Sequence, residues 1–600
     1  VTVTQLDDLV DFSGGQTIAD LPGADGLVAF REAVIAVNNT PGTHRIEFAI
    51  PPGDPLGDLL RIDGPAFTVT RDGTTVDFLS QAIFLGEPDP DGPGLGILNI
   101  SPGSAGQPAL VIDASDCEVR GLGFTQFRES IRIVGGQDNR IVRNFTNSIE
   151  VRPNFGGAVT GTMIGGAGPD DGNEAERISL LCGANDSIVI GNRVESIDVT
   201  GSPFCGDGVE RPTGNRIGGP TLSERNVVSG FGVYSGEGRP SGTGILIDFA
   251  SGTVVEGNFV GVNEDGTAQA DDQNRGTTGI EIRDSIDTVV RGNLVSGIRG
   301  IGISGFAGQV FGRAILVNAL NDNVSGVVIE DNLIGVDVTG QTEILTRAGI
   351  EVIPGTSFRS ISDVRIGGAD PAAGNVIAFT EGDGVTVAWP DVSGVEITRN
   401  RIHDNDGLGI DLRATSGSAG VTPNDAGDGD AGPNSFQNFP LISAANFDGA
   451  IAAIAGELSS SPDRSYRVEL FASPQADPSG HGEGQVFLGE ILVTTNANGQ
   501  ASFDLAIPAT SAGIGDGWVA TATATDVQRR ETSEFGPALA FVLDEACPAD
   551  LDGSGTVDAT DLFDLLSLWG SCPGCAGDLT GDDTVDADDL FELLAAWGSY

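Results

Sequence analysis

A short pattern centred on asparagine recurs across the middle of the chain and constrains its fold more than any other feature. Each copy has a β-branched run, an Asn that often follows Gly, and a second apolar run. Between residues 110 and 412, copies are centred on Asn144, Asn192, Asn215, Asn226, Asn258, Asn293, Asn332, Asn375 and Asn400. Segments such as 244–249 and 279–283 alternate as strands of about five residues do. This self-similarity, without intervening helical periodicity, predicts short parallel strands joined by turns and stacked coil upon coil, which is a parallel β-helix.

We interpret these asparagines as structural. Asn tolerates the left-handed backbone that a sharp turn needs. Its amide can both donate and accept, so an Asn stacked on the Asn of the next coil would satisfy buried polar groups of the turns. The sequence therefore predicts an asparagine ladder along the β-helix. Cys182 and Cys205 differ by 23 positions, about one short coil, and are candidate disulfide partners on adjacent coils.

The charge of the chain limits its partners. The 600 residues carry a formal net charge of −54, and the basic residues are all Arg. Such a polyanion repels nucleic acid and anionic lipid and favours cations such as Ca²⁺. No segment approaches the ~20 apolar residues of a membrane span. The chain starts at Val1 rather than Met, and with its acidity this favours a processed, secreted protein that acts outside the cell or at the cell surface.

The N-terminal region is expected to close one end of the β-helix. Leu27, Phe30, Val34 and Val37 have helical spacing, and Pro41-Gly42 ends the pattern. With the repeats, this segment resembles secreted bacterial right-handed β-helix proteins of the pectate-lyase-like superfamily, in which an amphipathic helix and a first strand open the fold. The resemblance implies a capping segment over 1–50 and a right-handed parallel β-helix over 51–420.

Residues with acid–base chemistry are scarce in the repeats. The absence of Lys excludes a Lys base, as some polysaccharide lyases use. The one candidate catalytic cluster is His403 with Arg401, Asp404 and Asp406. The alternative interpretation, which we favour, is that these residues form a turn in the last coil. Three arginines at a spacing of eight are candidates for binding an acidic glycan or for pairing with nearby acids: Arg283, Arg291 and Arg299.

Two further units are expected after the repeats. Residues 421–445 form an acidic linker, in which Asp425, Asp428 and Asp430 could share a hard cation. Residues 446–544 contain alternating runs typical of a β-sandwich, which we interpret as immunoglobulin-like. Asn498-Gly499 between two such runs predicts a hairpin.

The last 56 residues, 545–600, contain a tandem acidic repeat. Oxygen-bearing side chains fall at positions 1, 3, 5, 9 and 12 of two twelve-residue loops, and position 7 offers a carbonyl, as in EF-hand loops that bind Ca²⁺. The first set is Asp550, Asp552, Ser554, Thr556, Asp558 and Asp561. The second is Asp578, Thr580, Asp582, Thr584, Asp586 and Asp589. The second site should be weaker, because Asp583 replaces Gly at position 6.

This repeat resembles a dockerin module, with one helix after each calcium loop, and the Cys-bounded form found in secreted planctomycete proteins. The resemblance implies a cohesin-like or other cell-surface partner. Two apolar faces are expected to bury each other: Phe563, Leu566 and Trp569 against Phe591, Leu594 and Trp597. Cys547 is expected to pair with Cys572 or Cys575, and the sequence does not choose between them.

Two functions remain open. In the first, which we favour, a non-catalytic calcium-binding β-helix protein contacts glycan or cells and is anchored by its last module. In the second, the chain is a secreted polysaccharide lyase or glycoside hydrolase. Few His and Tyr residues favour the first, whereas the dockerin resemblance favours the second.

Overall fold

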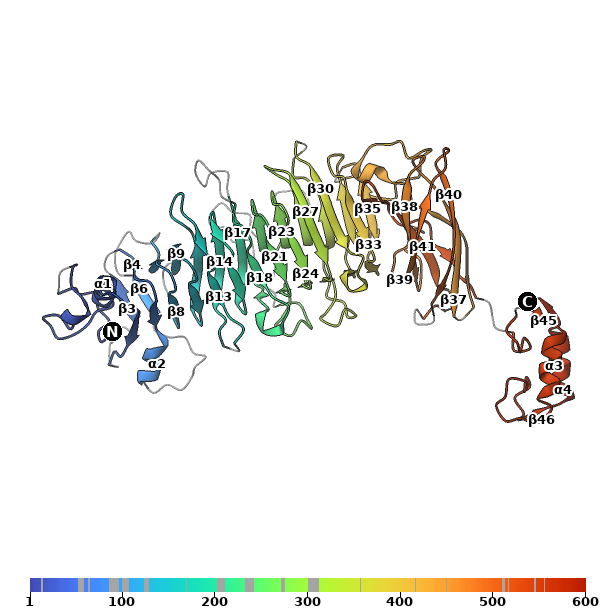
Figure 1. Ribbon diagram of the computed structural model, residues 1–600, viewed down its shortest axis with the longest axis horizontal. Coiled ribbons are helices and arrows are strands. Elements are labelled where there is room, and N and C mark those ends of the chain that lie inside the picture. Colours follow the sequence, from blue (N-terminus) through green and yellow to red (C-terminus); the bar gives the residue numbers. More distant parts are fainter. Residues whose placement is uncertain are drawn as a thin grey trace.

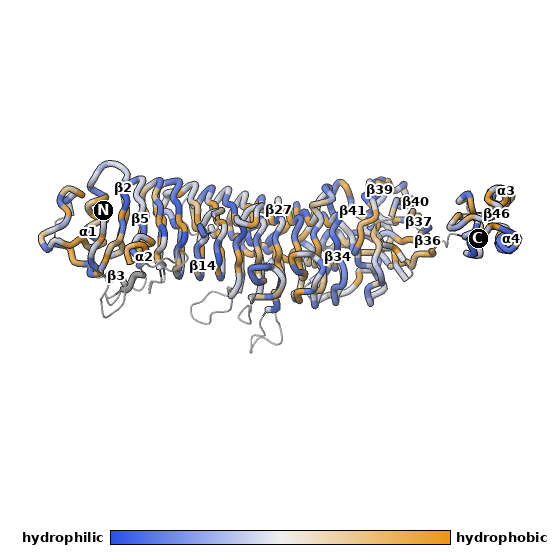
Figure 2. Tube along the Cα trace, turned by 90° about the horizontal axis from the view of Figure 1, so that it is seen from below, coloured by the Kyte–Doolittle hydropathy of each residue, from blue (hydrophilic) through white to orange (hydrophobic). Residues whose placement is uncertain are grey.

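The fold was analysed in a computed structural model, which describes the whole chain except residues 12–13, 52–58, 63–64, 86–95, 100–106, 124–128, 169, 202–210, 232–241, 271–275, 301–311, 357, 416, 449, 510–512, 516, 544–546, 555 and 600. It is mainly β, as predicted: a long parallel β-helix, a pair of antiparallel sheets, and a small helical unit at the C-terminus (Figure 1). Figure 2 shows the coils side by side, with the C-terminal unit apart from them.

Within the residues that the structure describes, one face of the β-helix is a stack of thirteen parallel strands. Its members are β1 (Thr2–Val3), β2 (His44–Phe48), β5 (Thr74–Asp77), β8 (Glu118–Arg120), β10 (Arg140–Val142), β13 (Met163–Gly165), β16 (Ile188–Ile190), β18 (Arg216–Gly218), β21 (Val254–Glu256), β24 (Val289–Arg291), β27 (Val324–Glu330), β30 (Ile361–Gly367) and β33 (Val395–Thr398). The predicted capping segment thus also contributes the first two strands of this stack.

The other strands of the coils form a second and a third stack. The second contains β4 (Phe67–Val69), β7 (Leu110–Asp113), β9 (Ile131–Gly135), β11 (Phe145–Val151), β14 (Glu174–Leu181), β17 (Arg193–Thr200), β20 (Thr243–Asp248), β23 (Thr278–Arg283), β26 (Arg313–Asn318), β29 (Ala348–Val352), β32 (Val385–Ala388) and β35 (Ile410–Arg413). The third contains β19 (Val227–Val228), β22 (Phe259–Val260), β25 (Leu294–Val295), β28 (Leu333–Ile334), β31 (Val376–Ala378) and β34 (Arg401–His403). The long strand β17 pairs with both β19 and β20, so the two stacks diverge there. Two minor parallel pairs flank the coils: β3 (Leu59–Ile62) with β6 (Gly96–Asn99), and β12 (Val159–Thr160) with β15 (Ala184–Asn185).

The predicted asparagine ladder is present, with changes in membership. Side-chain amides donate to the Oδ1 atom of the next asparagine at 2.8–3.0 Å in the order Asn144, Asn173, Asn192, Asn226, Asn258, Asn293, Asn332, Asn375, Asn400. Asn173 was missed, because its Gly-Asn-Glu context lacks the apolar runs. Asn215 instead accepts the Ser187 N–H at another turn. At six of the nine ladder positions the left-handed backbone belongs to the residue before the Asn, such as Gly257 (φ 66°) or Arg399 (φ 54°), and not to the Asn itself.

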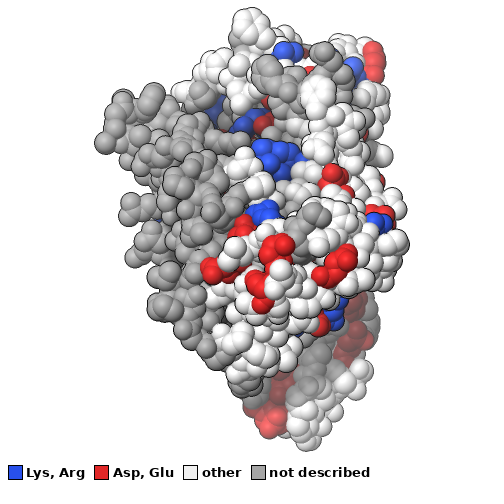
Figure 3. All heavy atoms as spheres, turned by 90° about the vertical axis from the view of Figure 1, so that its left-hand side faces the viewer, with Lys and Arg blue, Asp and Glu red and all other residues white. Residues whose placement is uncertain are grey.

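The N-terminal end is covered by α1 (Phe30–Asn39), which ends before Pro41 as expected. Phe30 packs against the rings of Phe48, Phe67 and Phe78, with centroids 4.3–5.7 Å apart. Leu27, predicted on the buried face, precedes the helix and is 43% exposed. Figure 3 views this end of the molecule, where acidic and Arg side chains lie interspersed. The remaining short helices of the β-helix region are α2 (Leu79–Leu85), η1 (Ile18–Asp20), η2 (Leu222–Glu224) and η3 (Pro371–Ala373), and η4 (Pro433–Phe436) lies in the linker.

The sandwich consists of two antiparallel sheets over one hydrophobic core. One sheet is β40 (Gln500–Pro508), β37 (Ile451–Ser459), β36 (Leu441–Phe447) and β44 (Val542–Leu543), with β44 parallel to β36. The other is β39 (Val486–Thr494), β38 (Ser465–Ser473), β41 (Val519–Asp526), β42 (Glu531–Thr532) and β43 (Leu539–Ala540). The hairpin predicted at Asn498-Gly499 is wrong: β39 pairs with β38 and β40 with β37, so this turn crosses between sheets.

The C-terminal unit contains two copies of a short strand and a helix. β45 (Thr556–Val557) precedes α3 (Ala559–Ser567), and β47 (Thr584–Val585) precedes α4 (Ala587–Ala595). These strands pair with β48 (Gly598–Ser599) and β46 (Gly570–Ser571), respectively. Its small core is centred on Val557, Leu565, Val585 and Leu593.

Candidate functional site

Charged side chains concentrate on the second stack toward its C-terminal end. One register row runs through consecutive coils as Glu281, Leu316, Glu351, Thr386 and Asp411. The neighbouring row includes Asp248, Arg283 and Asn318, and ends in Arg413. Because parallel strands lie about 4.8 Å apart, residues in register are close neighbours along the stack. The β-helix thus aligns acids and arginines that are far apart in sequence.

A pocket of about 170 Å³ lies on this face. Its charged and hydroxyl side chains are Arg313, Arg347, Glu351, Glu381, Asp383, Thr386 and Arg413. Each arginine has an acidic partner: Arg313 pairs with Glu351, Arg347 with Glu381 at 3.4 Å, and Arg413 with Asp383 and with Asp411 at 2.7 Å. The pocket therefore offers fixed hydrogen-bond donors and acceptors with most of its charge compensated.

Burial raises the pKa of two acidic side chains on this face. It raises the pKa of Asp411, and the charge of Asp383 acts in the same direction. Burial also raises the pKa of Asp248 to about 7, against the attraction of Arg283. Asp411 is fully buried, so it supports Arg413 rather than facing solvent.

A second pocket, of about 290 Å³, lies on β11, β14 and β17. Its outward side chains form two rows: Phe145, Glu174 and Arg193 in one, and Asn147, Glu176, Glu195 and Ser229 in the other. Phe145 is 41% exposed there, which gives the pocket an apolar ring beside polar groups. Nothing in the sequence singled out either pocket, because their residues converge only once the coil register is known.

Of the two interpretations of Arg283, Arg291 and Arg299, the structure agrees with pairing to nearby acids for the first two, and the three do not share one face. Arg283 lies on β23 of the second stack and pairs with Glu281 at 2.8 Å. Arg291 lies on β24 of the thirteen-stranded stack and pairs with Glu256 at 2.7 Å. Arg299 lies in the turn after β25 and is exposed.

The structure buries the centre of the predicted His403 cluster. His403 is 6% exposed, and its Nδ1 lies 2.7 Å from Asp404 Oδ2. Burial lowers the pKa of His403 despite the opposing charge of Asp404. Arg401 Nε donates to the Gln485 carbonyl of the sandwich, and Asp406 is exposed on the turn. The four residues therefore lie near the junction with the sandwich, and none of them lines either of the two pockets described above.

The first predicted calcium loop brings three carboxylates together. Oxygens of Asp550, Asp552 and Asp561 lie within 4.8 Å of one another. Asp561 is fully buried and accepts backbone N–H groups of Leu551, Asp552 and Asp558 at 2.7–3.1 Å, which closes the loop onto α3. The Ser554 hydroxyl lies 3.1 Å from the carbonyl of Thr556. This hard oxygen donor set fits Ca²⁺.

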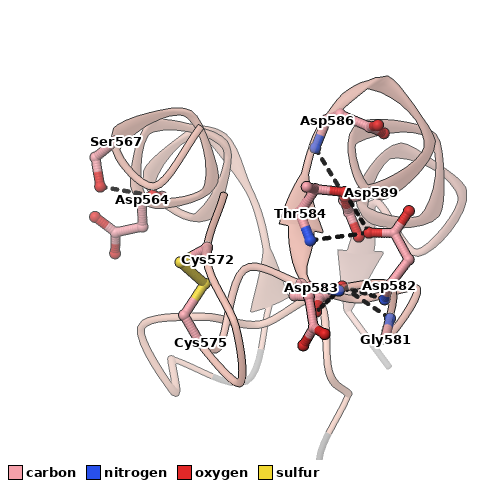
Figure 4. The surroundings of a disulfide bond; sticks show 11 residues. Asp564, Ser567, Cys572, Cys575, Gly581, Asp582, Asp583, Thr584, Asp586 and Asp589 are labelled. Atoms are coloured by element: carbon pink, nitrogen blue, oxygen red, sulfur yellow. Dashed lines mark hydrogen bonds between the residues drawn. A yellow bond between two sulfur atoms is a disulfide. The ribbon is translucent and has the colours of Figure 1, made fainter. Parts of the chain in front are cut away.

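The second loop has the same closure but different carboxylate partners. Asp589 accepts the N–H group of Asp586 at 2.8 Å (Figure 4). It also accepts the N–H group of Thr580 at 2.9 Å. Asp578 accepts three N–H groups of its own loop, from Gly581, Asp582 and Asp583. Asp582 accepts the Thr584 N–H. Asp558 and Asp586, the predicted position-9 ligands, are the N-caps of α3 and α4.

The linker acids also converge. Oxygens of Asp425, Asp428 and Asp430 lie within 4.8 Å of one another. Asp428 is buried and accepts the Asn438 N–H and the Ser460 hydroxyl, both at 2.8 Å. Burial raises its pKa to about 6. The cluster therefore joins the linker to the sandwich, whether or not a cation binds there.

The cysteines of the C-terminal unit pair differently from the prediction. Cys572 and Cys575 form a disulfide with each other (Figure 4). Cys547 is a free thiol. The prediction from sequence considered only disulfides between Cys547 and one of the two later cysteines. The disulfide in the structure instead closes the four-residue turn between the two repeats. The pair Cys182–Cys205 includes Cys205, which lies outside the described residues.

The two apolar faces predicted to bury each other are exposed. Phe563, Leu566 and Trp569 are 69%, 44% and 49% exposed, and Phe591, Leu594 and Trp597 are 66%, 46% and 47% exposed. The core instead uses Leu565 and Leu593, one per helix. Each helix, together with the Trp two residues after its end, thus presents a Phe-Leu-Trp face to solvent.

Comparisons with known proteins gave only distant structural likenesses. No family model and no curated protein matches the chain. A GH87 alpha-1,3-glucanase catalytic domain in complex with nigerose is 12% identical over 68% of this chain and 67% of that chain, with a TM-score of 0.34. A double mutant of the tailspike of E. coli bacteriophage HK620 in complex with a pentasaccharide is 12% identical over 85% and 92%, with a TM-score of 0.31. The Dettilon tailspike is 13% identical over 84% and 87%, with a TM-score of 0.28.

Likenesses at TM-scores of this size leave the function to be inferred from the residues of this chain. In the described parts of the chain, none of the helices has the length and apolar character needed to cross a membrane.

Proposed function

We propose that this chain is an extracellular or cell-surface β-helix protein that binds glycan on its second stack and is anchored through a calcium-binding C-terminal module. The observation that carries the proposal is the presence of two pockets on one continuous stack, lined by carboxylates, guanidinium groups, hydroxyls and an exposed Phe. Sugars offer hydroxyls for such charge-assisted hydrogen bonds and apolar ring faces for an aromatic side chain. The net charge of −54 argues against nucleic acid as the ligand.

A carbohydrate microarray probed with the full chain tests glycan binding. We expect retention on a subset of glycans, and at least about tenfold weaker binding for Arg313→Ala or Phe145→Ala, equivalent to about 1.4 kcal/mol. Arg152→Ala is the matched control, since Arg152 is a half-exposed arginine outside both pockets. The proposal would be contradicted if the array retained no glycan, or if both pocket variants bound glycan as tightly as the wild type.

The C-terminal module is proposed to dock on a partner protein of cohesin-like or other cell-surface type. Its exposed Phe-Leu-Trp faces support this, because apolar surface beside polar loops is typical of protein interfaces. The Cys572–Cys575 disulfide supports an oxidising, extracellular location. Binding to a panel of cohesin domains and to intact bacterial cells should require Ca²⁺ and be lost when Trp569 and Trp597 are both replaced by Ala. Binding that is unchanged by removal of Ca²⁺ and by the two Trp substitutions would exclude this role.

The alternative function is a secreted polysaccharide lyase or glycoside hydrolase. One observation favours the hydrolase: two glutamates lie on adjacent strands in the second pocket.

A further inference from the structure

The second pocket contains a pair of glutamates on adjacent coils. Glu176 of β14 and Glu195 of β17 each lie between two register pairs, Ala175–Val194 and Arg177–Ser196, so they are opposite one another. Strand spacing places their backbones about 4.8 Å apart, with both side chains on the outer face. Both line the same cavity. Side chains in register at this backbone spacing can bring their carboxyl groups to the separation of about 5–5.5 Å that is used to hydrolyse glycosides with retention of configuration.

The two glutamates have different environments. Glu176 is exposed, whereas Glu195 is partly buried. Burial raises the pKa of Glu195, and the negative charge of Glu176 raises it further. Glu195 is thereby biased toward the protonated acid, which suits the acid role when a pair of identical side chains divides acid and nucleophile roles.

The rest of the lining suits an uncharged sugar. Phe145 provides an exposed ring, and Asn147 and Ser229 provide hydrogen-bonding groups in the row of the glutamates. Arg193, the one basic residue lining the pocket, is paired with Glu264. Three glutamates face this pocket, so an anionic uronate would be repelled.

We propose that the second pocket hydrolyses a glycosidic bond in a neutral polysaccharide, with Glu195 as acid/base and Glu176 as nucleophile; this rests on the proposed glycan binding. The Glu176 carboxylate attacks the anomeric carbon, the bond from that carbon to the leaving oxygen breaks, and the Glu195 proton passes to this oxygen. Water then attacks the same carbon of the glycosyl ester and gives one proton to Glu195. The ester bond breaks, which restores Glu176 as a carboxylate and releases a sugar with a new reducing end.

The test uses the full chain with dextran, pullulan, laminarin, xylan and polygalacturonate as probes. We expect new reducing ends from a neutral probe and none from polygalacturonate. Glu195→Gln should lose about 10²–10⁴-fold in rate, the range for a positioned general acid or base, and Glu176→Gln, which removes the nucleophile, should lose at least as much. Affinity electrophoresis should show that both variants still bind. Glu343→Gln, an exposed glutamate elsewhere on the β-helix, is the matched control and should keep full activity.

Two further readouts identify the roles. A 2-deoxy-2-fluoro glycoside of the cleaved sugar should leave its mass on the peptide containing Glu176, and the first product should keep the anomeric configuration. Binding without hydrolysis of any neutral probe would overturn the catalytic inference and leave the glycan-binding proposal standing. Absence of both binding and hydrolysis would overturn both. Hydrolysis unchanged in the two Gln variants would assign the activity elsewhere and overturn the roles given to this pair.

Discussion

Glu534 of the sandwich accepts the backbone N–H of Leu412 in the last coil of the β-helix at 2.8 Å, although 122 positions separate the two residues. Its other carboxyl oxygen accepts the Thr422 N–H, also at 2.8 Å. Leu412 lies on β35, the final strand of its stack, so its N–H has no further coil to pair with. A side chain of the sandwich therefore takes the place of the missing strand.

The same arrangement repeats around the end of the β-helix. Glu469 accepts the Arg399 N–H at 3.0 Å, Glu483 the Asn405 N–H at 3.3 Å, and the Thr532 hydroxyl the Ile397 N–H at 2.9 Å. Phe535 packs into the β-helix core. Open strand edges are templates for aggregation unless they are covered. The sandwich thus works as the C-terminal cap of the β-helix, as α1 does at the other end.

The first prediction is that Glu534→Gln destabilises the junction by about 1–3 kcal/mol, the cost of leaving a buried donor unsatisfied. A Gln side chain keeps one oxygen but places an NH₂ group against the second backbone N–H. In thermal unfolding of the full chain, the temperature of the first transition should fall. Aggregation of the β-helix should begin at a lower temperature than in the wild type. Glu457→Gln, an exposed glutamate on β37, is the control. Equal melting of the two variants would count against the capping role.

The second prediction concerns pH. Burial raises the pKa of both Glu534 and Glu483 to about 8, and nearby acids add to this: Asp411 and Asp383 for Glu534, Asp477 and Asp404 for Glu483. The native state therefore holds more protons than the unfolded chain, whose Glu residues titrate near pH 4.3. Stability contributed by these groups is full below about pH 4 and is lost as the pH rises to about 8.

Melting temperatures measured from pH 5 to 8.5 should therefore fall more steeply for the wild type than for the Glu483→Gln/Glu534→Gln double variant. Carboxylates that are paired with arginines elsewhere in the chain have the opposite pH dependence, because they lose their stabilising contribution as the pH falls. Comparison with the double variant separates the two effects. A wild-type slope no steeper than that of the double variant would show that the two carboxyl groups do not titrate in this window.

Sequence reasoning reached the fold because its signals are local. Turn asparagines, alternating strands and the helix before Pro41 each depend on neighbours in the chain. The pockets could not be found in this way, because Glu176 and Glu195 become neighbours only through coil register. Nor could the capping role of Glu534, since nothing near it in sequence indicates Leu412. The exposed Trp569 and Trp597 were misassigned because helical spacing defines a face but not what covers it.

The third prediction tests the ladder. Asn258 is fully buried and donates to the Ile217 carbonyl at 2.9 Å and to Asn293 Oδ1 at 3.0 Å, while its own Oδ1 accepts from Asn226 at 2.9 Å. Asn258→Ala leaves these partners unsatisfied and should destabilise the β-helix by several kcal/mol, as loss of a buried network does. Asn498→Ala, on an exposed turn of the sandwich, should melt like the wild type. A wild-type melting temperature for Asn258→Ala would show that the ladder contributes little.

The fourth prediction is that chelation unfolds residues 547–600 and leaves the β-helix intact. The core of this unit is small, and without a cation the carboxylates of Asp550, Asp552 and Asp561 repel one another. With EDTA, limited proteolysis should remove the C-terminal unit, and the β signal in circular dichroism should persist. Digestion patterns that are identical with and without EDTA would show that the module needs no metal.

The fifth prediction concerns the second loop, which we expect to bind Ca²⁺ more weakly than the first. Asp583 occupies its sixth position with a φ of 68°, a left-handed conformation that Asp tolerates better than most L-residues but that Gly adopts without a Cβ penalty. Its contact to Asp578 is made by the backbone N–H, at 2.8 Å, and Gly would keep that bond. Asp583→Gly should therefore stabilise the loop by about 1 kcal/mol after the entropy cost of Gly, and tighten the weaker site about fivefold.

Calcium titration calorimetry on the full chain would measure this change, with two classes of site expected in the wild type. Asp583→Asn is the matched control, because it removes the same charge as Gly does and keeps a side chain in the left-handed conformation. If Asn alone reproduces the gain, the limiting factor is charge repulsion or the Asp side chain and not the backbone. If neither variant changes the weaker site, Asp583 does not limit calcium binding, and the weakness must come from Thr580, which stands where the first loop has Asp552.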